Sequence, residues 1–177
     1  MVRELITLMM HGPSFSGKST LVIRYVKNKV EKMLLMTMGV DIFQKNVSID
    51  SKNVHAVIYD LGGKHMFKSM WKVFLAPADV FIIVFDLSSP KGLDDIEIYV
   101  DSIFSVKNRV PVILAGNKCD LEKKIDDEKI MQVRKMIGEK LGENEPIPYF
   151  EVSAVTGKNV NRMFEFAIRK ALEFKEK

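Results

Sequence analysis

The chain has 177 residues, 47% of them hydrophobic, which is enough for one well-buried domain over residues 1–177 and too few for two ordinary domains. Its 27 lysines and arginines and 23 aspartates and glutamates are scattered along the chain, so nucleic-acid binding is not implied. The single cysteine, Cys119, cannot form an internal disulfide, which suits a cytoplasmic protein.

Short β-type runs alternate with amphipathic stretches along the chain, a pattern typical of a mostly parallel sheet covered by helices. We expect strands over residues 5–10, 41–49, 54–60, 80–87, 110–117 and 148–152. Only the polar stretch 50–53 separates the second from the third, which predicts an antiparallel hairpin. The expected fold is therefore α/β, with a six-stranded, mostly parallel sheet, one antiparallel edge strand and helices on both faces.

The amphipathic stretches between the strands predict helices that pack on the sheet. The first is expected to begin near Lys18. Ser89 is expected to cap a later helix, with Pro90 in its first turn, and Gly142 to close another. The residues predicted to face the sheet are Leu93, Ile96, Val100 and Ile103, then Ile130, Val133, Ile137 and Leu141, and last Val160, Met163, Phe164, Ala167, Ile168, Ala171 and Leu172.

A glycine-rich loop follows the first strand, where residues 12–19 read GPSFSGKS and match GxxxxGK(S/T). Glycines let main-chain N–H groups turn toward phosphates, and the helix that follows adds its positive end. Lys18 would reach the β- and γ-phosphates, and Ser19 would place its hydroxyl on Mg²⁺. An adenylate-type kinase or an ATPase carries the same loop, so the base stays open. The expected contacts are Gly12, Ser14, Phe15, Ser16, Gly17, Lys18, Ser19 and Thr20.

The base is indicated by residues 117–120, which read NKCD at the end of an apolar strand. Asp120 can accept hydrogen bonds from N1–H and N2–H₂ of guanine, a donor pair that adenine lacks, while the stem of Lys118 can cover the ring. After the next strand, the N–H of Ala154 could reach guanine O6. GTP or GDP is therefore the expected ligand, held by Asn117, Lys118, Asp120, Ser153, Ala154 and Val155.

Two further segments indicate a γ-phosphate and a metal ion. Residues 60–63 read DLGG, in which Asp60 can hold a Mg²⁺-bound water and the N–H of Gly63 can meet the γ-phosphate. Thr37 precedes the hairpin and could coordinate Mg²⁺ only when a γ-phosphate is present. The expected metal site is therefore Ser19, Thr37 and Asp60.

These motifs, in this order, resemble those of Ras-superfamily small GTPases over nearly the whole chain. The segment TMGVD at residues 37–41 is similar to Rab proteins, whereas DLGG followed by Trp71 and Phe74 is similar to Arf and Sar proteins. The resemblance implies a P-loop NTPase fold and a GTP/GDP switch whose segments around Thr37 and 60–71 are read by effectors. It also implies an exchange factor and an activating protein. A P-loop kinase of a small metabolite would leave residues 117–120 without a role.

The chain departs from the family after the DxxG glycine, where Lys64 replaces the usual glutamine. A lysine ammonium only donates hydrogen bonds and cannot receive a proton from the attacking water, so slow hydrolysis is expected. His65 is either a substitute, as in Sar-type sequences, or a solvent-facing residue. The alternative function is a GTP-bound scaffold with almost no hydrolysis. The expected catalytic residues are Lys18, Thr37, Gly63, Lys64 and His65.

Membrane attachment and partner binding are the last properties on which the sequence bears. Val2 excludes N-myristoylation and the chain ends without a prenylation cysteine, so we expect no direct lipid anchor and membrane recruitment only through a partner. Phe15 is either an exposed aromatic beside the nucleotide or a partner, or a packed side chain. Lys64, Lys68 and Lys72 recur every four residues, beside the apolar residues Met66, Phe67, Met70, Trp71 and Phe74. Either the lysines are a solvated face and the apolar residues pack on the sheet, or the GTP form presents this segment to an acidic partner with an exposed aromatic or two as anchors.

Overall fold

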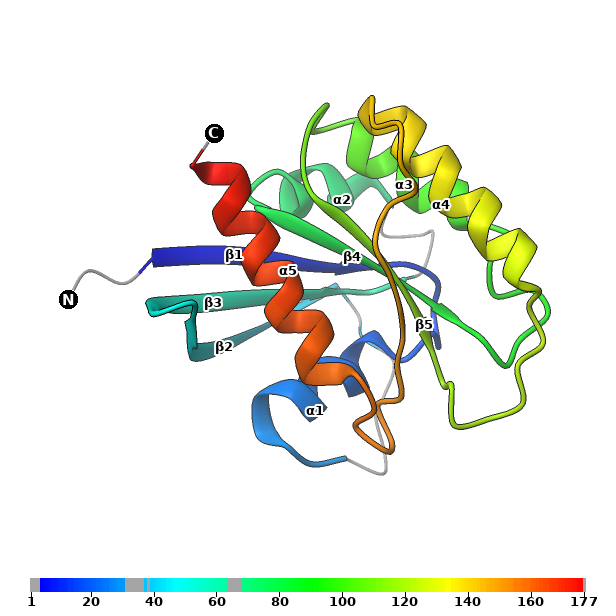
Figure 1. Ribbon diagram of the computed structural model, residues 1–177, viewed down its shortest axis with the longest axis horizontal. Helices are drawn as coiled ribbons and strands as arrows, with labels where there is room; N and C mark the ends of the chain where they lie inside the picture. The colour runs from blue at the N-terminus through cyan, green and yellow to red at the C-terminus, as the bar shows by residue number, and fades with distance from the viewer. Residues whose placement is uncertain (1–3, 31–36, 38, 64–67, 177) are drawn as a thin grey trace.

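The structure, a computed structural model, describes residues 4–30, 37, 39–63 and 68–176. Its strands form one six-stranded sheet in the order β2-β3-β1-β4-β5-β6, in which β2 is antiparallel to β3 and the other described pairs are parallel (Figure 1). The predicted sheet with one antiparallel edge strand is confirmed. The strands are β1 (Glu4–His11), β2 (Val40–Ile49), β3 (Lys52–Leu61), β4 (Val80–Asp86), β5 (Val112–Asn117) and β6 (Tyr149–Glu151).

Helices cover both faces of this sheet, as predicted (Figure 1). One face carries α1 and α5, and the other carries α2, α3 and α4. Successive side chains of β1 point to opposite faces: Leu8 and Met10 lie in the core under α1 and α5, and Met9 lies in the second core, under α2, α3 and α4. The helices are α1 (Lys18–Lys27), α2 (Lys68–Leu75), α3 (Ile96–Phe104), α4 (Asp127–Leu141) and α5 (Val160–Lys175).

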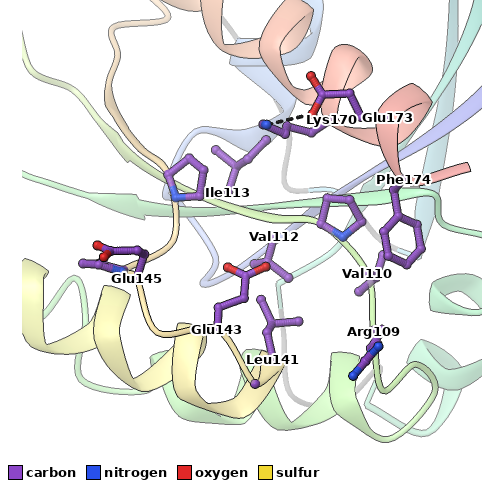
Figure 2. Close-up of a pocket in the computed structure, with 14 residues that line it drawn as sticks. Arg109, Val110, Val112, Ile113, Leu141, Glu143, Glu145, Lys170, Glu173 and Phe174 are labelled. Carbon is purple, nitrogen blue, oxygen red and sulfur yellow. Dashed lines mark hydrogen bonds and ion pairs between the residues drawn. The ribbon is translucent and has the colours of Figure 1, made fainter. Parts of the chain in front are cut away.

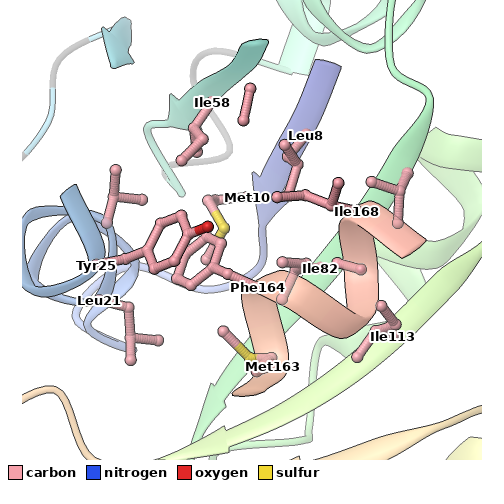
Figure 3. Packing of buried hydrophobic residues seen from close by; sticks show 14 of the residues in the cluster. Leu8, Met10, Leu21, Tyr25, Ile58, Ile82, Ile113, Met163, Phe164 and Ile168 are labelled. Atoms are coloured by element: carbon pink, nitrogen blue, oxygen red, sulfur yellow. The ribbon is translucent and has the colours of Figure 1, made fainter. Parts of the chain in front are cut away.

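The core under α1 and α5 follows the predicted apolar stripe of the last helix, since each member of that stripe is buried. Figure 3 shows Tyr25 of α1 and Phe164 of α5 lying together over Met10, and their rings stack with centroids 4.2 Å apart. Fully burying each large apolar side chain stabilises the fold by roughly 1.5–3 kcal/mol. This packing fixes α1, and with it the loop before α1, against the sheet.

The hairpin between β2 and β3 has a tighter turn than expected. Asp50 and Ser51 both have positive φ, 48° and 67°, which is the pattern of a two-residue turn that matches strand twist. Strand β3 therefore begins at Lys52, and Lys52 pairs with Ile49. Polar Lys52 and Asn53 resembled loop residues in the sequence, but they lie in the ladder on a partly exposed edge hairpin.

The prediction that Ser89 caps a helix is wrong, because α3 begins only at Ile96. The intervening residues form turns, in which the Gly92 N–H donates to the Ser89 carbonyl at 3.0 Å. A Cβ on Gly92 would lie 2.2 Å from the Asp86 carbonyl oxygen, so the chain folds back closely over the end of β4. The apolar residues predicted there are still buried, and Gly142 closes α4 with a φ of 73°, as expected.

The strand order brings the carboxyl ends of β1, β3, β4, β5 and β6 to one edge of the sheet, because these strands are mutually parallel. In open α/β sheets, ligands bind at this edge where the strand order reverses. Here β3 lies on one side of β1 and the next strand in the chain, β4, lies on the other side, so the strand order reverses at β1. Across the described residues, no helix is long and apolar enough to cross a membrane.

Candidate functional site

The glycine-rich loop leaves β1 at the centre of this edge and turns sharply into α1. A Cβ on Gly12 would lie 2.2 Å from the Val84 carbonyl oxygen, and one on Gly17 would lie 2.2 Å from Nδ2 of Asn117. Both glycines also have positive φ, 128° and 89°. Only glycine fits either position, so the loop can approach a ligand with its main-chain N–H groups.

Lys18 is buried at the start of α1, and its ammonium contacts the glycine-rich loop. Its Nζ donates to the carbonyls of Gly12 at 2.9 Å and Pro13 at 2.7 Å. Burial lowers the pKa of Lys18 to about 8, and the nearby charge of Asp60 opposes that shift. A buried cation satisfied mainly by carbonyls is stabilised by an anion, and a phosphate group supplies one.

A pocket of about 300 Å³ opens beside Lys18. It brings the glycine-rich loop together with Thr37, the DLGG segment and Lys118, although these segments are far apart in the sequence. A phosphate chain and its metal ion fit a pocket of this size. Its lining residues are Ser14, Phe15, Gly17, Lys18, Ser19, Thr20, Thr37, Leu61, Gly62, Gly63 and Lys118.

The three predicted metal ligands converge in this pocket. The Ser19 hydroxyl donates to Oδ2 of Asp60, and Oγ1 of Thr37 lies 2.9 Å from Oγ of Ser19 and 3.3 Å from the same carboxylate oxygen. The other oxygen of Asp60, Oδ1, is buried and has no hydrogen-bond partner among the residues that the structure describes. Burial raises the pKa of Asp60, and hydrogen bonds from Ser19 with the charge of Lys18 oppose the rise.

This set of oxygen atoms fits Mg²⁺, which favours hard oxygen ligands and keeps several waters or substrate phosphates in its shell. Oδ1 of Asp60 is the atom that such a shell would satisfy. Within the described ranges, no cluster of three or more His, Cys, Asp or Glu side chains could hold a metal by itself. A metal here would therefore share its coordination with a bound phosphate.

The side chain of Asn117 connects the glycine-rich loop to the segment at residues 153–155. Its Nδ2 donates to the Ser16 carbonyl at 2.8 Å, and its Oδ1 accepts the N–H of Ala154 at 3.2 Å. Arg24 of α1 donates from Nε to the Ala154 carbonyl at 3.0 Å and from Nη2 to the Val155 carbonyl. Sequence reasoning missed Arg24, since no motif marks a helix arginine that holds a loop 130 residues away.

The other predicted base contacts lie on the same side of the site. Lys118 has a positive φ of 65° and pairs through Nζ with Oδ2 of Asp86 at 2.6 Å. Asp120 is exposed to solvent, so its carboxylate is open to a ligand. Ser153 is buried, and its hydroxyl accepts the N–H of Thr156 at 3.0 Å. The N–H of Ala154, expected to face guanine O6, donates to Asn117 here.

Burial decides whether Phe15 and Trp71 are packed or exposed. The Phe15 side chain is 77% exposed, so the interpretation that it packs into the protein is wrong. Trp71 is 1% exposed and lies in the second core with Phe74 partly buried against it, so Trp71 is not an exposed anchor. Gly63 lies against the glycine-rich loop. Lys64 and His65 lie outside the described residues.

A larger cavity of about 600 Å³ lies away from these motifs, between the start of β5, the end of α4 and the end of α5 (Figure 2). Its lining includes Val112, Leu141 and Phe174, and its charged Lys170 and Glu173 pair with each other at 2.8 Å. None of the predicted site residues lines it. Size alone therefore does not mark the functional site.

The fold and the phosphate-cradling loop at its carboxyl edge define a P-loop nucleotide-binding protein. The model of the Ras family matches residues 7–173, so the chain belongs to the Ras family and is a GTP-binding small GTPase. It is 30% identical over 170 residues to "Ras-related protein Rab-13" of Bos taurus, covering 96% of this chain and 81% of the relative. It is 30% identical over 179 residues to "Ypt/Rab-type GTPase ypt7" of Schizosaccharomyces pombe, covering 97% and 84%. It is 31% identical over 173 residues to "Ras-related protein Rab-27B" of Rattus norvegicus, covering 91% and 77%.

Proposed function

We propose that this chain is a Mg²⁺-dependent switch that binds GTP and GDP and hydrolyses GTP slowly. The observation that carries the proposal is the convergence of Ser19, Thr37 and Asp60, whose buried Oδ1 has no hydrogen-bond partner in the described part of the chain. The buried ammonium of Lys18 would contact the β- and γ-phosphates beside them. When bound, Mg²⁺ would neutralise phosphate charge, with Ser19, Thr37 and Asp60 as the residues that hold it.

Thr37 is the residue that would distinguish GTP from GDP. It belongs to the segment before β2, yet its hydroxyl reaches Ser19 at the start of α1. A γ-phosphate would stabilise this position together with the metal, and its loss would remove that support. Effectors would then read the segments around Thr37 and 60–71, while an exchange factor and an activating protein set the ratio of GTP to GDP.

Guanine selectivity is proposed to come from Asp120, whose exposed carboxylate can accept two donors of the base. Lys118 is held by Asp86 at the rim of the phosphate pocket, where its stem can lie along the ring. The Asn117 bonds to Ser16 and Ala154 support this proposal, because they keep the phosphate side and the base side in one arrangement.

A second candidate function is a scaffold that keeps GTP bound and rarely hydrolyses it. It is favoured by Lys64, the residue at the usual glutamine position, because an ammonium cannot accept a proton from water. In the switch, Lys64 and His65 would be the residues beside the attacking water, and hydrolysis would be slow without an activating protein.

Single-turnover conversion of bound GTP to GDP, measured with and without cell extract, separates the two functions. A switch converts GTP slowly alone and faster with extract, whereas a scaffold shows no conversion in either. The same preparation tests the metal site: chelation of Mg²⁺ and the variant Ser19→Ala should each speed nucleotide release. Ser48→Ala, an exposed serine on β2, is the matched control and should not change release. Failure to bind either nucleotide would contradict both functions.

A further inference from the structure

A series of hydrogen bonds, buried at Tyr99 and partly buried at Ser102, links the end of β1 to the DLGG segment through α3. His11 is the residue before Gly12, and its Nε2 lies 2.8 Å from Oγ of Ser102. The Ser102 hydroxyl donates to the Tyr99 carbonyl at 2.7 Å, one turn back on α3. At the other end of the same residue, the Tyr99 hydroxyl donates to the Gly63 carbonyl at 2.8 Å.

The direction of each bond follows from the proton inventory. Ser102 has one hydroxyl proton and uses it toward Tyr99, so it accepts from Nε2–H of His11. The His11 ring is then neutral with its proton on Nε2, which agrees with a pKa lowered to about 3 by burial and by the charge of Lys18. His11 therefore donates to Ser102, and Ser102 donates to the Tyr99 carbonyl.

Aromatic packing holds the Tyr99 ring in place. His11 meets Trp71 edge-on with centroids 4.7 Å apart and Tyr99 edge-on at 5.0 Å, and the Trp71 and Tyr99 centroids are 5.3 Å apart. All three side chains are buried. Because the ring is enclosed by these side chains, the Tyr99 hydroxyl is held toward the Gly63 carbonyl.

Gly63 is held from its opposite side by the glycine-rich loop. A Cβ on Gly63 would lie 2.5 Å from both the Gly12 carbonyl oxygen and the Ser14 nitrogen, and 2.6 Å from the Pro13 carbonyl carbon. No side chain fits in that space. The Gly63 main chain therefore lies between the phosphate-binding loop and the Tyr99 hydroxyl.

We propose that Tyr99 is a positioning residue that holds Gly63 against the phosphate-binding loop and thereby favours GTP over GDP. The inference rests on the proposed function, in which the Gly63 N–H meets the γ-phosphate. GDP has no γ-phosphate and gains nothing from a Gly63 held in this position. Tyr99 thus acts on the ratio of the two affinities, through the Gly63 backbone and without touching nucleotide.

The test is Tyr99→Phe, which keeps the ring and removes only the hydroxyl. The affinities for a non-hydrolysable GTP analogue and for GDP are measured by competition. Loss of a buried hydrogen bond should weaken the GTP analogue about tenfold and leave GDP within about twofold. Fluorescence of Trp71, the one tryptophan in the sequence, reports whether the aromatic packing around the ring survives.

The matched control is Tyr25→Phe. The Tyr25 hydroxyl is also buried, lies in the core under α1 and α5, and has no hydrogen-bond partner within the described ranges. It should change neither affinity. If Tyr99→Phe fails to fold, Ser102→Ala removes the bond to the Tyr99 main chain and should shift the ratio in the same direction.

A Tyr99→Phe protein that binds both nucleotides as the wild type does, or loses both affinities equally, would overturn the inference and leave the proposed switch intact. A wild-type protein that binds neither nucleotide would overturn the proposed function, and the inference with it. A selective loss of the GTP analogue supports both.

Discussion

The side-chain amide nitrogen of Asn117 donates a hydrogen bond of 2.8 Å to the main-chain carbonyl of Ser16, 101 residues earlier in the chain. Both residues are buried, and the amide oxygen of Asn117 accepts the N–H of Ala154. One side chain therefore uses its donor and its acceptor to hold two separate loops. This makes Asn117 a structural determinant of the site as well as a proposed nucleotide contact.

Asn117→Asp should release GDP and GTP at least about tenfold faster, because a carboxylate would face the Ser16 carbonyl with an acceptor in place of the donor. Dissociation of fluorescent GDP and of a fluorescent GTP analogue measures the effect. Asn108→Asp, an exposed residue after α3, introduces the same charge as a control. Unchanged release from Asn117→Asp would show that the loops keep their arrangement without this bond.

Asp120→Asn should shift base preference from guanine toward xanthine. The carboxamide turns one acceptor into a donor, which opposes the N2–H₂ of guanine and suits the C2 carbonyl of xanthine. Titration with labelled GTP and XTP gives both affinities. If GTP affinity stays the same and XTP affinity does not rise, Asp120 does not read the base.

Lys64→Gln should speed GTP hydrolysis about tenfold, equivalent to roughly 1.4 kcal/mol of barrier, because glutamine can both accept from and donate to the attacking water. Single-turnover hydrolysis measures the rate, with Lys72→Gln, exposed on α2, as the control. A slower Lys64→Gln protein would instead make Lys64 catalytic through its charge. His65→Ala in the same assay shows whether the neighbouring residue contributes.

His11 should make the protein less stable as the pH falls. Burial first, and then the charge of Lys18, lower its folded pKa from the ordinary value of 6.5 to about 3. The unfolded chain therefore binds more protons between these pH values, and the free energy of unfolding decreases as pH falls through that window. Between pH 7 and 5 this linkage amounts to about 2 kcal/mol.

Urea unfolding at pH 7 and pH 5, with GDP in excess, measures this dependence. His11→Gln removes the titration and keeps an N–H that can donate to Ser102, so its stability should fall less between the two pH values. Equal losses in the wild type and the variant would place the pH dependence in other groups.

Local patterns were sufficient for most of the fold. The stripe from Val160 to Leu172 predicts a helix with one apolar face because its spacing follows the helical period, and every member of the stripe is buried. Strand β4 is buried at nearly every position and reads as an unbroken apolar run. The Ser89 cap failed because close contact with the end of β4, a tertiary feature, opposes the local helix signal.

The sequence by itself determined the class of fold, the glycine-rich loop and the family, since each depends on residues close together in the chain, whose spacing is itself the signal. Only the tertiary structure decided which distant groups meet. Strand order brings Gly63 to the Tyr99 hydroxyl and Arg24 to Ala154, and no local spacing encodes such pairs. Burial of Trp71 and exposure of Phe15 were likewise decided by the surrounding elements, because an aromatic side chain is compatible with either environment until its neighbours are placed.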